Sequence, residues 1–247
     1  MILYWYSALT WIRSRQGSLF LWYYTCMKTV VYIDGQNFLY KASDVLIKNE
    51  FISNKQELHR LDIRGLISNI ISDEDIEIKY YGAKVKVINQ KGEDVYAKSR
   101  SFSDNLRRLK NTLNQQQIKY IESGKLKLRD SDLCKNCGHQ DLRFQEKGVD
   151  VGIAVDMIVD AVSGNIEQSV ILSSDTDLIP AIKVVRSLLP SVIYLGFSDK
   201  LTNAINSQVT RTETIRDSEI IDAYKRLNSL PIIDEIGSNA PATEDIT

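Results

Sequence analysis

Four aspartates in three separated motifs are the residues of this chain best suited to chemistry. Asp34 follows the apolar run of VVYIDGQNF, Asp150 lies in EKGVDVGIAVD, and Asp175 and Asp177 lie in VILSSDTDLIPAI. Residues that follow parallel strands gather at the carboxyl edge of a sheet, where α/β proteins bind ligands. Carboxylates crowded there repel one another unless a cation neutralises them, and hard oxygen ligands favour Mg²⁺ or Mn²⁺. The four aspartates therefore outline a metal-dependent phosphodiester hydrolase.

Helix capping is the alternative role for three of these aspartates. Asp34 and Asp177 each precede a predicted helix, where an Asp side chain commonly accepts hydrogen bonds from free backbone N–H groups. Asp150 opens a helix whose dipole favours a negative charge at that end. Asp175 and Asp177 are separated by one residue, so they can bind one cation together, whereas capping explains only one of the pair.

Two further aspartates lie on the helix that begins near Asp150. At about 100° per residue, Asp156 lies about 120° and Asp160 about 80° from Asp150 around the helix axis. Because neither can point where Asp150 points, we expect Asp156 to support the site from behind. We expect Asp160 to be a solvated surface residue.

The alternation of strands and helices predicts an α/β fold with parallel strand pairing and right-handed crossovers. The expected strands are 28–33, 76–82, 118–122, 169–173 and 192–196. The expected helices are 37–48, 61–71, 101–116, 149–162, 177–188, 202–209 and 217–227. Gly124 is expected to form a turn before an exposed or edge strand at 125–129, where apolar and polar residues alternate. The buried stripe of the helix 101–116 is expected to comprise Phe102, Leu106, Leu109 and Leu113.

Three motifs occur in a defined order: YIDGQN after the first strand, KGVDVGIAVD on a helix, and LSSDTDLIPAI after a later strand. Together they resemble the NYN domain family of PIN-like nucleases, and most closely its bacterial LabA-like branch, over about Met27 to Ile215. The resemblance implies a Rossmann-like, PIN-type three-layer sandwich with a mainly parallel central sheet of about five strands. It also implies a metal-dependent ribonuclease that leaves a 5′-phosphate and a 3′-hydroxyl. By this resemblance Asp34 and Asp150 take metal-site positions, and Asp156 matches a further family position.

Several polar residues beside the aspartates are expected to contact the substrate. Asn37 can orient a water or a phosphate through its amide, with helix capping as the alternative, and Lys147 can contact a phosphate. Ser173 and Ser174 offer hydroxyl and backbone N–H groups to phosphate or to a water held by the metal.

A basic segment indicates a polymeric substrate. Between positions 79 and 129 the chain has 13 lysines and arginines but 4 acidic residues, although the net charge of the whole chain is −1. Such a local excess of positive charge favours binding to a phosphate backbone, and we expect Arg100, Arg107 and Arg108 to contribute. Tyrosines interleaved in the segment can stack on bases of single-stranded RNA; they are Tyr80, Tyr81, Tyr96 and Tyr120. The alternative is a solvated charged helix with the tyrosines in the core.

The motif CKNCGH suggests a second metal site. Cys134, Cys137 and His139 supply three ligands suitable for structural Zn²⁺, which takes four. A second subunit could complete the site in a homo-oligomer; the alternative is a reduced loop with two free thiols. The three cysteines of the chain argue against a disulfide framework and favour a reducing cytoplasm.

The two ends of the chain differ from the rest. Residues 1–26 carry all three tryptophans, and Arg13 and Arg15 interrupt their apolar runs before these reach the roughly 20 residues of a membrane span. We expect an extension outside the fold, with Met27 as the natural start and no membrane partner; an interfacial membrane anchor is the alternative. Residues 27–228 are expected to form the nuclease domain, with a CxxC insert near 130–145. Residues 229–247 are expected to form a flexible acidic tail.

The predicted function is a metal-dependent endoribonuclease that hydrolyses RNA phosphodiester bonds at the aspartate cluster. One alternative is a non-catalytic RNA-binding or regulatory protein that keeps the PIN-like fold. Another is a phosphoesterase acting on small molecules. A pure binder gains nothing from carboxylates placed against RNA phosphates, and the basic segment favours a polymer. His59 and His139 lie outside the motifs, which argues against a histidine-based ribonuclease.

Overall fold

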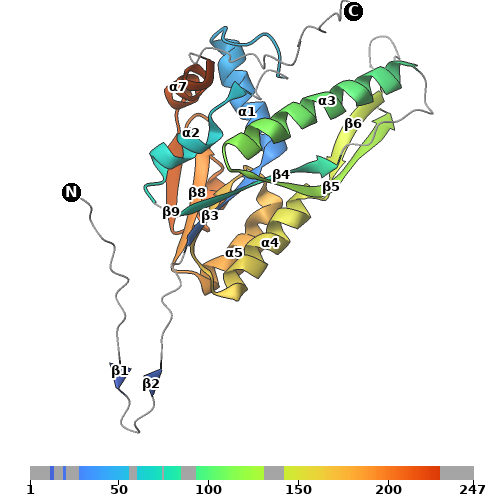
Figure 1. Ribbon diagram of the computed structural model, residues 1–247. Helices are drawn as coiled ribbons and strands as arrows, with labels where there is room; N and C mark the ends of the chain where they lie inside the picture. Colours follow the sequence, from blue (N-terminus) through green and yellow to red (C-terminus); the bar gives the residue numbers. More distant parts are fainter. Residues whose placement is uncertain are drawn as a thin grey trace, which may run out of the picture.

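The computed structural model describes residues 28–55, 60–73, 75–84, 93–130 and 142–228, together with two short strands, β1 (Ile12–Arg13) and β2 (Leu19–Phe20). β1 and β2 pair with each other in antiparallel fashion and are not part of the main sheet (Figure 1). In the described part of the chain, no helix is long and apolar enough to cross a membrane.

A seven-stranded sheet forms the centre of the molecule (Figure 1). Its order is β6-β5-β4-β3-β7-β8-β9, and every neighbouring pair is parallel except β5 and β6. The strands are β3 (Lys28–Asp34), β4 (Ile76–Lys84), β5 (Lys119–Asp130), β6 (Leu142–Lys147), β7 (Ile166–Leu172), β8 (Ser191–Phe197) and β9 (Arg211–Ile215). The predicted α/β class is confirmed, but the sheet is mixed and larger than the expected five or so strands. The two edge strands β6 and β9 are the additional ones.

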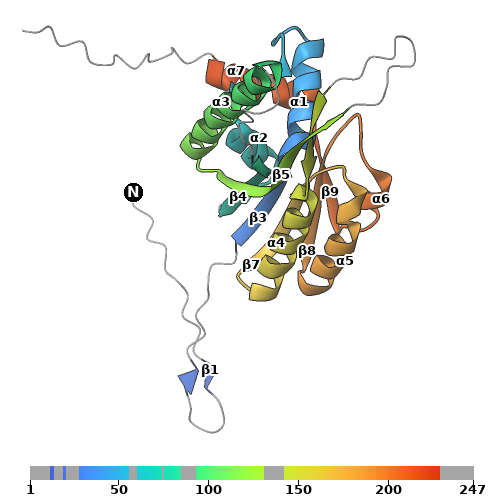
Figure 2. The same cartoon turned by 90° about the vertical axis from the view of Figure 1, so that its right-hand side faces the viewer.

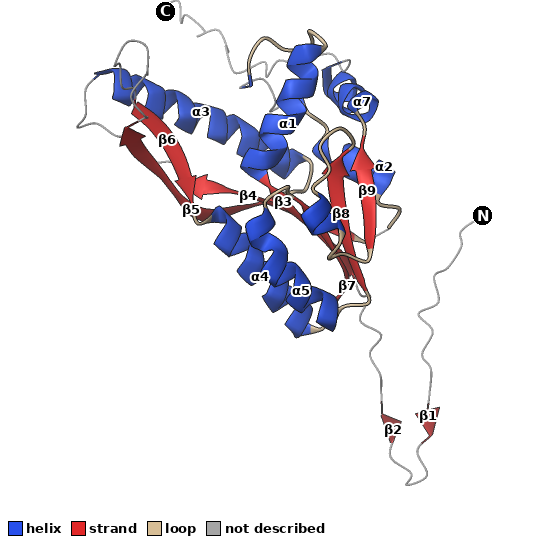
Figure 3. Ribbon diagram, turned by 180° about the vertical axis from the view of Figure 1, so that it is seen from behind, coloured by secondary structure: helices blue, strands red, loops and turns tan. Residues whose placement is uncertain are grey.

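Helices cover both faces of the sheet, so the domain has three layers (Figures 2 and 3). α1 (Gly35–Lys48), α2 (Ile63–Ile70), α3 (Glu93–Gln115) and α7 (Asp217–Asn228) pack on one face. α4 (Val149–Ser163), α5 (Ile179–Leu188) and the short α6 (Asn203–Asn206) pack on the other. Each face buries its own apolar cluster against the sheet, as expected when parallel strands are shielded on both sides.

Helix α3 departs from its predicted form. It begins at Glu93, eight residues before the expected start, and ends at Gln115. Leu113 is buried and Leu109 packs against the core, as predicted, but Phe102 is 47% exposed. The apolar stripe therefore anchors the C-terminal half of the helix to the sheet.

Gly124 lies within a strand and not in the predicted turn. β5 continues through it, and its register against β4 shifts between the pairs Gly82–Glu122 and Lys84–Lys125, so that β5 has one extra residue. Gly124 has φ +76°, a left-handed conformation that glycine adopts without a steric penalty. This bulge lies where β5 leaves β4 and continues as a two-stranded ribbon with β6.

Asp160 is not the solvated surface residue that we expected. Its carboxylate accepts a hydrogen bond of 2.6 Å from the Tyr32 hydroxyl and forms an ion pair of 2.6 Å with Lys79. Asp156 accepts a hydrogen bond of 2.8 Å from the hydroxyl of Tyr81, one strand away from Tyr32. The two aspartates thus bind α4 to buried tyrosines of the central strands, and the N-terminus of α4 carries Asp150.

Candidate active site

The order of the strands places a topological switch point at the centre of the carboxyl edge. From β3 the chain adds β4, β5 and β6 on one side, and then returns to add β7, β8 and β9 on the other. Such a reversal leaves the two connections diverging above the neighbouring strand ends, which is where α/β proteins bind ligands. The reversal falls between β3, which ends at Asp34, and β7, which ends just before Ser173.

Asp34 is held in place by contacts from the segments that follow β3 and β7. Its Oδ1 accepts a hydrogen bond of 3.0 Å from the backbone N–H of Asn37, so that Asp34 caps α1. Its Oδ2 accepts a hydrogen bond of 3.0 Å from the Ser173 hydroxyl. Burial raises the pKa of Asp34 despite these bonds, and the charge of Asp175 raises it further. Capping and a place in the acidic cluster are therefore compatible.

The segment after β7 is connected to the same point. Ser173 is buried, and its Oγ also accepts a hydrogen bond of 3.1 Å from the backbone N–H of Asp175. The Asn37 side-chain amide donates a hydrogen bond of 2.7 Å to the Ser174 hydroxyl. Asn37 and Ser173 therefore cross-link the ends of β3 and β7. Ser174 remains partly exposed beside them.

Asp175 and Asp177 differ in their surroundings. Asp175 caps the short 3₁₀ helix Thr176–Leu178 by accepting a hydrogen bond of 2.9 Å from the Asp177 N–H, and it lies close enough to Asp34 to affect that group electrostatically. Asp177 is exposed. The structure thus couples Asp175 directly to Asp34, and places Asp177 at the solvent side of the same turn.

Glu146, which the sequence analysis did not select, joins the acidic residues from the opposite side. It lies on β6, four residues before Asp150, and a hydrogen bond from the backbone N–H of Ala83 reaches its carboxylate. Burial, followed by the charge of Asp34, raises the pKa of Glu146 to about 7, and the charge of Asp150 adds to the rise. Glu146 therefore links Asp150 at the start of α4 with Asp34 at the end of β3.

A lysine on α1 was also missed. Lys41 is partly buried, and its Nζ lies 5.3 Å from the centre of the Phe197 ring. Burial lowers the pKa of Lys41, whereas the negative charges of Asp199 and Asp34 act in the opposite direction. Lys41 follows Asp34 by two turns of helix, and this spacing could have indicated that the two side chains lie on the same side of α1.

The oxygen atoms of the site suit a hard cation, although they are not closed around one. Among the described residues, no three His, Cys, Asp or Glu side chains are close enough together to hold a metal ion. However, three buried side-chain atoms among the described residues lack a hydrogen-bond partner. Two of these atoms, Asn37 Oδ1 and Glu146 Oε1, belong to this site. Buried oxygens without partners require an ion or a water. The side chains of Asp34, Asp150, Asp175 and Asn37 offer oxygen atoms as acceptors, which is the donor type that Mg²⁺ and Mn²⁺ prefer.

The remaining predicted residues fall into three groups. Lys147 is exposed beside the site, between Glu146 and the N-terminus of α4. Arg100, Arg107 and Arg108 are exposed on α3, and Arg107 forms an ion pair of 3.6 Å with Asp104. Cys134, Cys137 and His139, proposed as zinc ligands, lie outside the described residues.

Two of the tyrosines predicted to stack on bases are in the core. Tyr80 and Tyr81 are 2% and 0% exposed, so the prediction is wrong for them. Tyr120 stacks on Tyr80 with 6.0 Å between ring centres and is half-buried. Tyr96 is the exposed member of the set.

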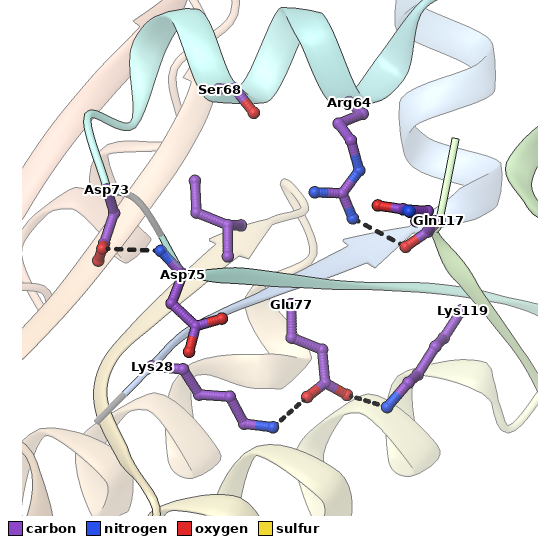
Figure 4. Close-up of a pocket in the computed structure, with 9 residues that line it drawn as sticks. Lys28, Arg64, Ser68, Asp73, Asp75, Glu77, Gln117 and Lys119 are labelled. Carbon is purple, nitrogen blue, oxygen red and sulfur yellow. Dashed lines mark hydrogen bonds and ion pairs between the residues drawn. The ribbon is translucent and has the colours of Figure 1, made fainter. Parts of the chain in front are cut away.

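A separate pocket of about 410 Å³ opens at the other, amino edge of the sheet (Figure 4). Its three basic residues, Lys28, Arg64 and Lys119, are balanced by three acidic ones, Asp73, Asp75 and Glu77. Glu77 accepts hydrogen bonds of 2.6 Å from Lys28 and 2.7 Å from Lys119. Burial opposes ionisation of Glu77, but the two lysines prevail and lower its pKa to about 2. Arg64 donates a hydrogen bond of 2.8 Å to the carbonyl of Gln117. Such a pocket has little unbalanced charge with which to attract a ligand, in contrast to the carboxyl edge.

Comparison with known proteins identifies the family of this chain. Residues 28–215 match the NYN domain. This chain belongs to the NYN domain family. Membership confirms the family suggested by the three motifs and supports a relationship to PIN-like nucleases.

Two individual proteins are similar to this NYN domain protein. It is 28% identical over 180 residues to 6-hydroxy-3-succinoylpyridine 3-monooxygenase HspA of Pseudomonas putida, an alignment that covers 65% of this chain and 56% of HspA. The chain therefore spans little more than half of that relative. The crystal structure of a protein of unknown function from Vibrio parahaemolyticus aligns with 79% of this chain and 96% of its own, at 16% identity and a TM-score of 0.44.

The bulge in β5 is expected to position Asp150. A Cβ on Gly124 would lie 2.3 Å from the Lys147 carbonyl oxygen, so Gly124→Ala must displace the turn that leads into α4. We expect this variant to lose about 1–3 kcal/mol of unfolding free energy in urea. Gly164→Ala is the matched control, because Gly164 also has a positive φ, +70°, but nothing within 4 Å of an added Cβ, so its loss should be smaller. An equal loss of unfolding free energy in both variants would contradict this role of the bulge.

The raised pKa of Glu146 predicts a pH-dependent stability of the metal-free NYN domain. The folded protein holds a proton on Glu146 up to about pH 7, whereas the ordinary pKa is 4.5. Because the folded state binds more protons in this window, the unfolding free energy falls as the pH rises from about 4.5 to 7. Glu146→Gln should reduce this decline in thermal unfolding with EDTA; Asp34, whose pKa is also raised, remains and preserves part of it. Glu167→Gln, at an exposed position of β7, is the control. An unchanged pH dependence in Glu146→Gln would refute the assignment.

Proposed function

We propose that this protein is a metal-dependent endoribonuclease of the LabA-like branch, which hydrolyses phosphodiester bonds of single-stranded RNA at the carboxyl edge of its sheet. The observation that carries the proposal is the convergence of acidic residues from β3, β6, α4 and the turn after β7 on the point where the sheet order reverses. The charge of Asp175 raises the pKa of Asp34, and the charge of Asp34 raises the pKa of Glu146, and such perturbed buried acids are typical of a functional site. Membership of the NYN family supports the same conclusion.

Asp34, Asp150, Asp175 and Asp177 would hold the cation, with Asn37 Oδ1 as a further oxygen donor. When bound, Mg²⁺ or Mn²⁺ supplies charge that polarises a phosphate and increases the acidity of water. The side chains around the site hold the acidic residues in position. Ser173 and Asn37 fix the two central strand ends relative to each other, and so fix the separation of Asp34 and Asp175.

Proton transfer and charge neutralisation are assigned to two residues that the motifs did not indicate. Glu146 Oε1 is a buried acceptor without a partner, and is suited to accept a proton from the attacking water. Lys41 lies within electrostatic reach of Asp34 and is suited to neutralise an oxygen of the substrate phosphate. Ser174, which is partly exposed beside Asp175, can orient that phosphate.

The non-catalytic alternative predicts that the protein binds RNA without cleaving it. The observation that favours this alternative is that no three acidic side chains of the described residues lie close enough together to hold a metal ion. Crowded carboxylates oppose it, because they repel RNA phosphates when no cation is bound. The monooxygenase activity in the name of HspA belongs to a protein of which this chain covers 56%.

The test is cleavage of an end-labelled single-stranded RNA by the full chain with Mn²⁺, Mg²⁺ or EDTA. Asp175→Asn keeps an acceptor for the Asp177 N–H, since Asn is also a good helix cap, but removes the charge. We expect metal-dependent cleavage that falls on the order of 100-fold in this variant. Asp222→Asn, at an exposed position of α7, should cleave as the wild type does. Cleavage that persists in EDTA, or in Asp175→Asn, would exclude the mechanism, and binding without cleavage would favour the regulatory alternative.

A further inference from the structure

We propose that the RNA backbone is held on one face of the β5–β6 ribbon by Lys125, Lys127 and Lys147, beside the acidic site. The ribbon comprises Lys125–Asp130 of β5 and Leu142–Lys147 of β6. The inference rests on the proposed function, because it names the surface that presents the polymer to that site.

Strand geometry places the three lysines together. Lys125 and Lys127 are two residues apart on β5, so they lie on the same face, about 7 Å apart. Lys147 pairs directly with Lys125 across the ribbon and therefore shares that face. Leu126 and Glu146, paired with each other, alternate with the lysines; Leu126 packs against the core and Glu146 is partly buried. All three lysine side chains are exposed.

The bulge at Gly124 is responsible for this arrangement. Before it, Ile121 packs towards the core cluster on the α4 side of the sheet; after it, Leu126 packs against the same cluster. Ile121 and Leu126 are five residues apart, so in a regular strand they would lie on opposite faces of the sheet. The extra residue of the bulge puts them on the same face. Without the bulge, Leu126 would face outwards and the lysines would face the core.

The pairing of Lys125 with Lys147 is electrostatically unfavourable unless an anion lies over it. Like charges directly opposite each other destabilise a sheet. Among the described residues, no carboxylate forms an ion pair with Lys125, Lys127 or Lys147. The lysines and the arginine of this basic segment that do form ion pairs have nearby acids: Lys79 with Asp160, Lys84 and Lys110 with Glu122, Lys119 with Glu77, and Arg107 with Asp104. Among the described residues, Lys125, Lys127 and Lys147 thus join Lys98, Arg100 and Arg108 of α3 as exposed basic residues without an ion pair, and the three lysines of the ribbon are the ones beside the acidic site.

The position of the ribbon identifies that anion as a polymer that passes the acidic site. Lys147 lies next to Glu146 and three residues before Asp150, and the Ser123 hydroxyl, beside the bulge, donates a hydrogen bond of 3.3 Å to the Gly148 carbonyl. Positive charges spaced along an extended ribbon suit successive phosphates of one strand, whereas a small phosphoester would span one of them. A contact to phosphate alone carries no base specificity.

The test is fluorescence anisotropy of a labelled 20-nucleotide oligouridylate with the full chain in EDTA, between 50 and 200 mM NaCl. Each phosphate contact in a single strand contributes about 0.7 to the slope of log K against log salt concentration. The triple variant Lys125→Gln, Lys127→Gln, Lys147→Gln should therefore reduce the slope by about 2. The matched control Lys48→Gln, Lys183→Gln, Lys225→Gln removes the same charge from exposed positions of α1, α5 and α7, and should leave the slope unchanged.

Folding provides a second measurement. Lys125→Gln alone relieves the repulsion from Lys147, so its thermal midpoint should equal or exceed that of the wild type while its RNA affinity falls. A slope unaffected by the triple variant, an equal loss in the control, or an absence of RNA binding by the wild type would overturn the inference. Because EDTA is present throughout, RNA binding through these lysines without later cleavage in Mn²⁺ would refute the proposed nuclease and leave the surface assigned.

Discussion

The carboxylate of Asp34 sits at the end of the central strand, largely out of water and within reach of other negative charges. Its two hydrogen bonds, from Asn37 and Ser173, reduce the cost of this position but do not remove it, and the pKa of the group remains raised. Glu146 on β6 is also buried near negative charges, and its pKa is also raised. A folded protein that keeps such groups together without a compensating charge sacrifices stability. A bound cation removes this conflict, and the elements around the site are arranged so that it can bind there.

Hydrogen bonds and a β-bulge hold the elements that bring the acidic residues together. Asp156 and Asp160 fasten α4 to the hydroxyls of Tyr81 and Tyr32, which fixes the helix that carries Asp150. Gly124 allows β5 to change partners from β4 to β6, and β6 carries Glu146. The same change of partner exposes a row of lysines. The bulge at Gly124 therefore determines both the position of the Glu146 carboxylate and the lysine surface that we assign to RNA.

The motifs were sufficient to locate the ends of β3 and β7, because VVYI and SVIL are apolar, β-branched runs followed at once by polar residues. The layers and the parallel core of the sheet followed from the alternation of such runs with helices. β6 and β9 were missed because LRFQEK and RTETI contain few β-branched apolar residues, and edge strands need to bury less. Glu146 was missed with its strand: its role depends on a pairing across residues 131–141, which local sequence does not specify. Asp160 was misjudged because helical angle alone does not show that Tyr32 and Lys79 lie beneath it.

The most direct test of the central claim is to locate the cation. Crystals of the full chain equilibrated with Mn²⁺ should show an anomalous scattering peak between the carboxylates of Asp34 and Asp175, with Asp150 completing its ligands. The account predicts that this peak is lost in Asp34→Asn, a variant that can still accept the hydrogen bond that caps α1. A well-ordered wild-type crystal without Mn²⁺ at this edge would contradict the account. The same is true of one in which Mn²⁺ binds only beside Asp73, Asp75 and Glu77 at the amino edge.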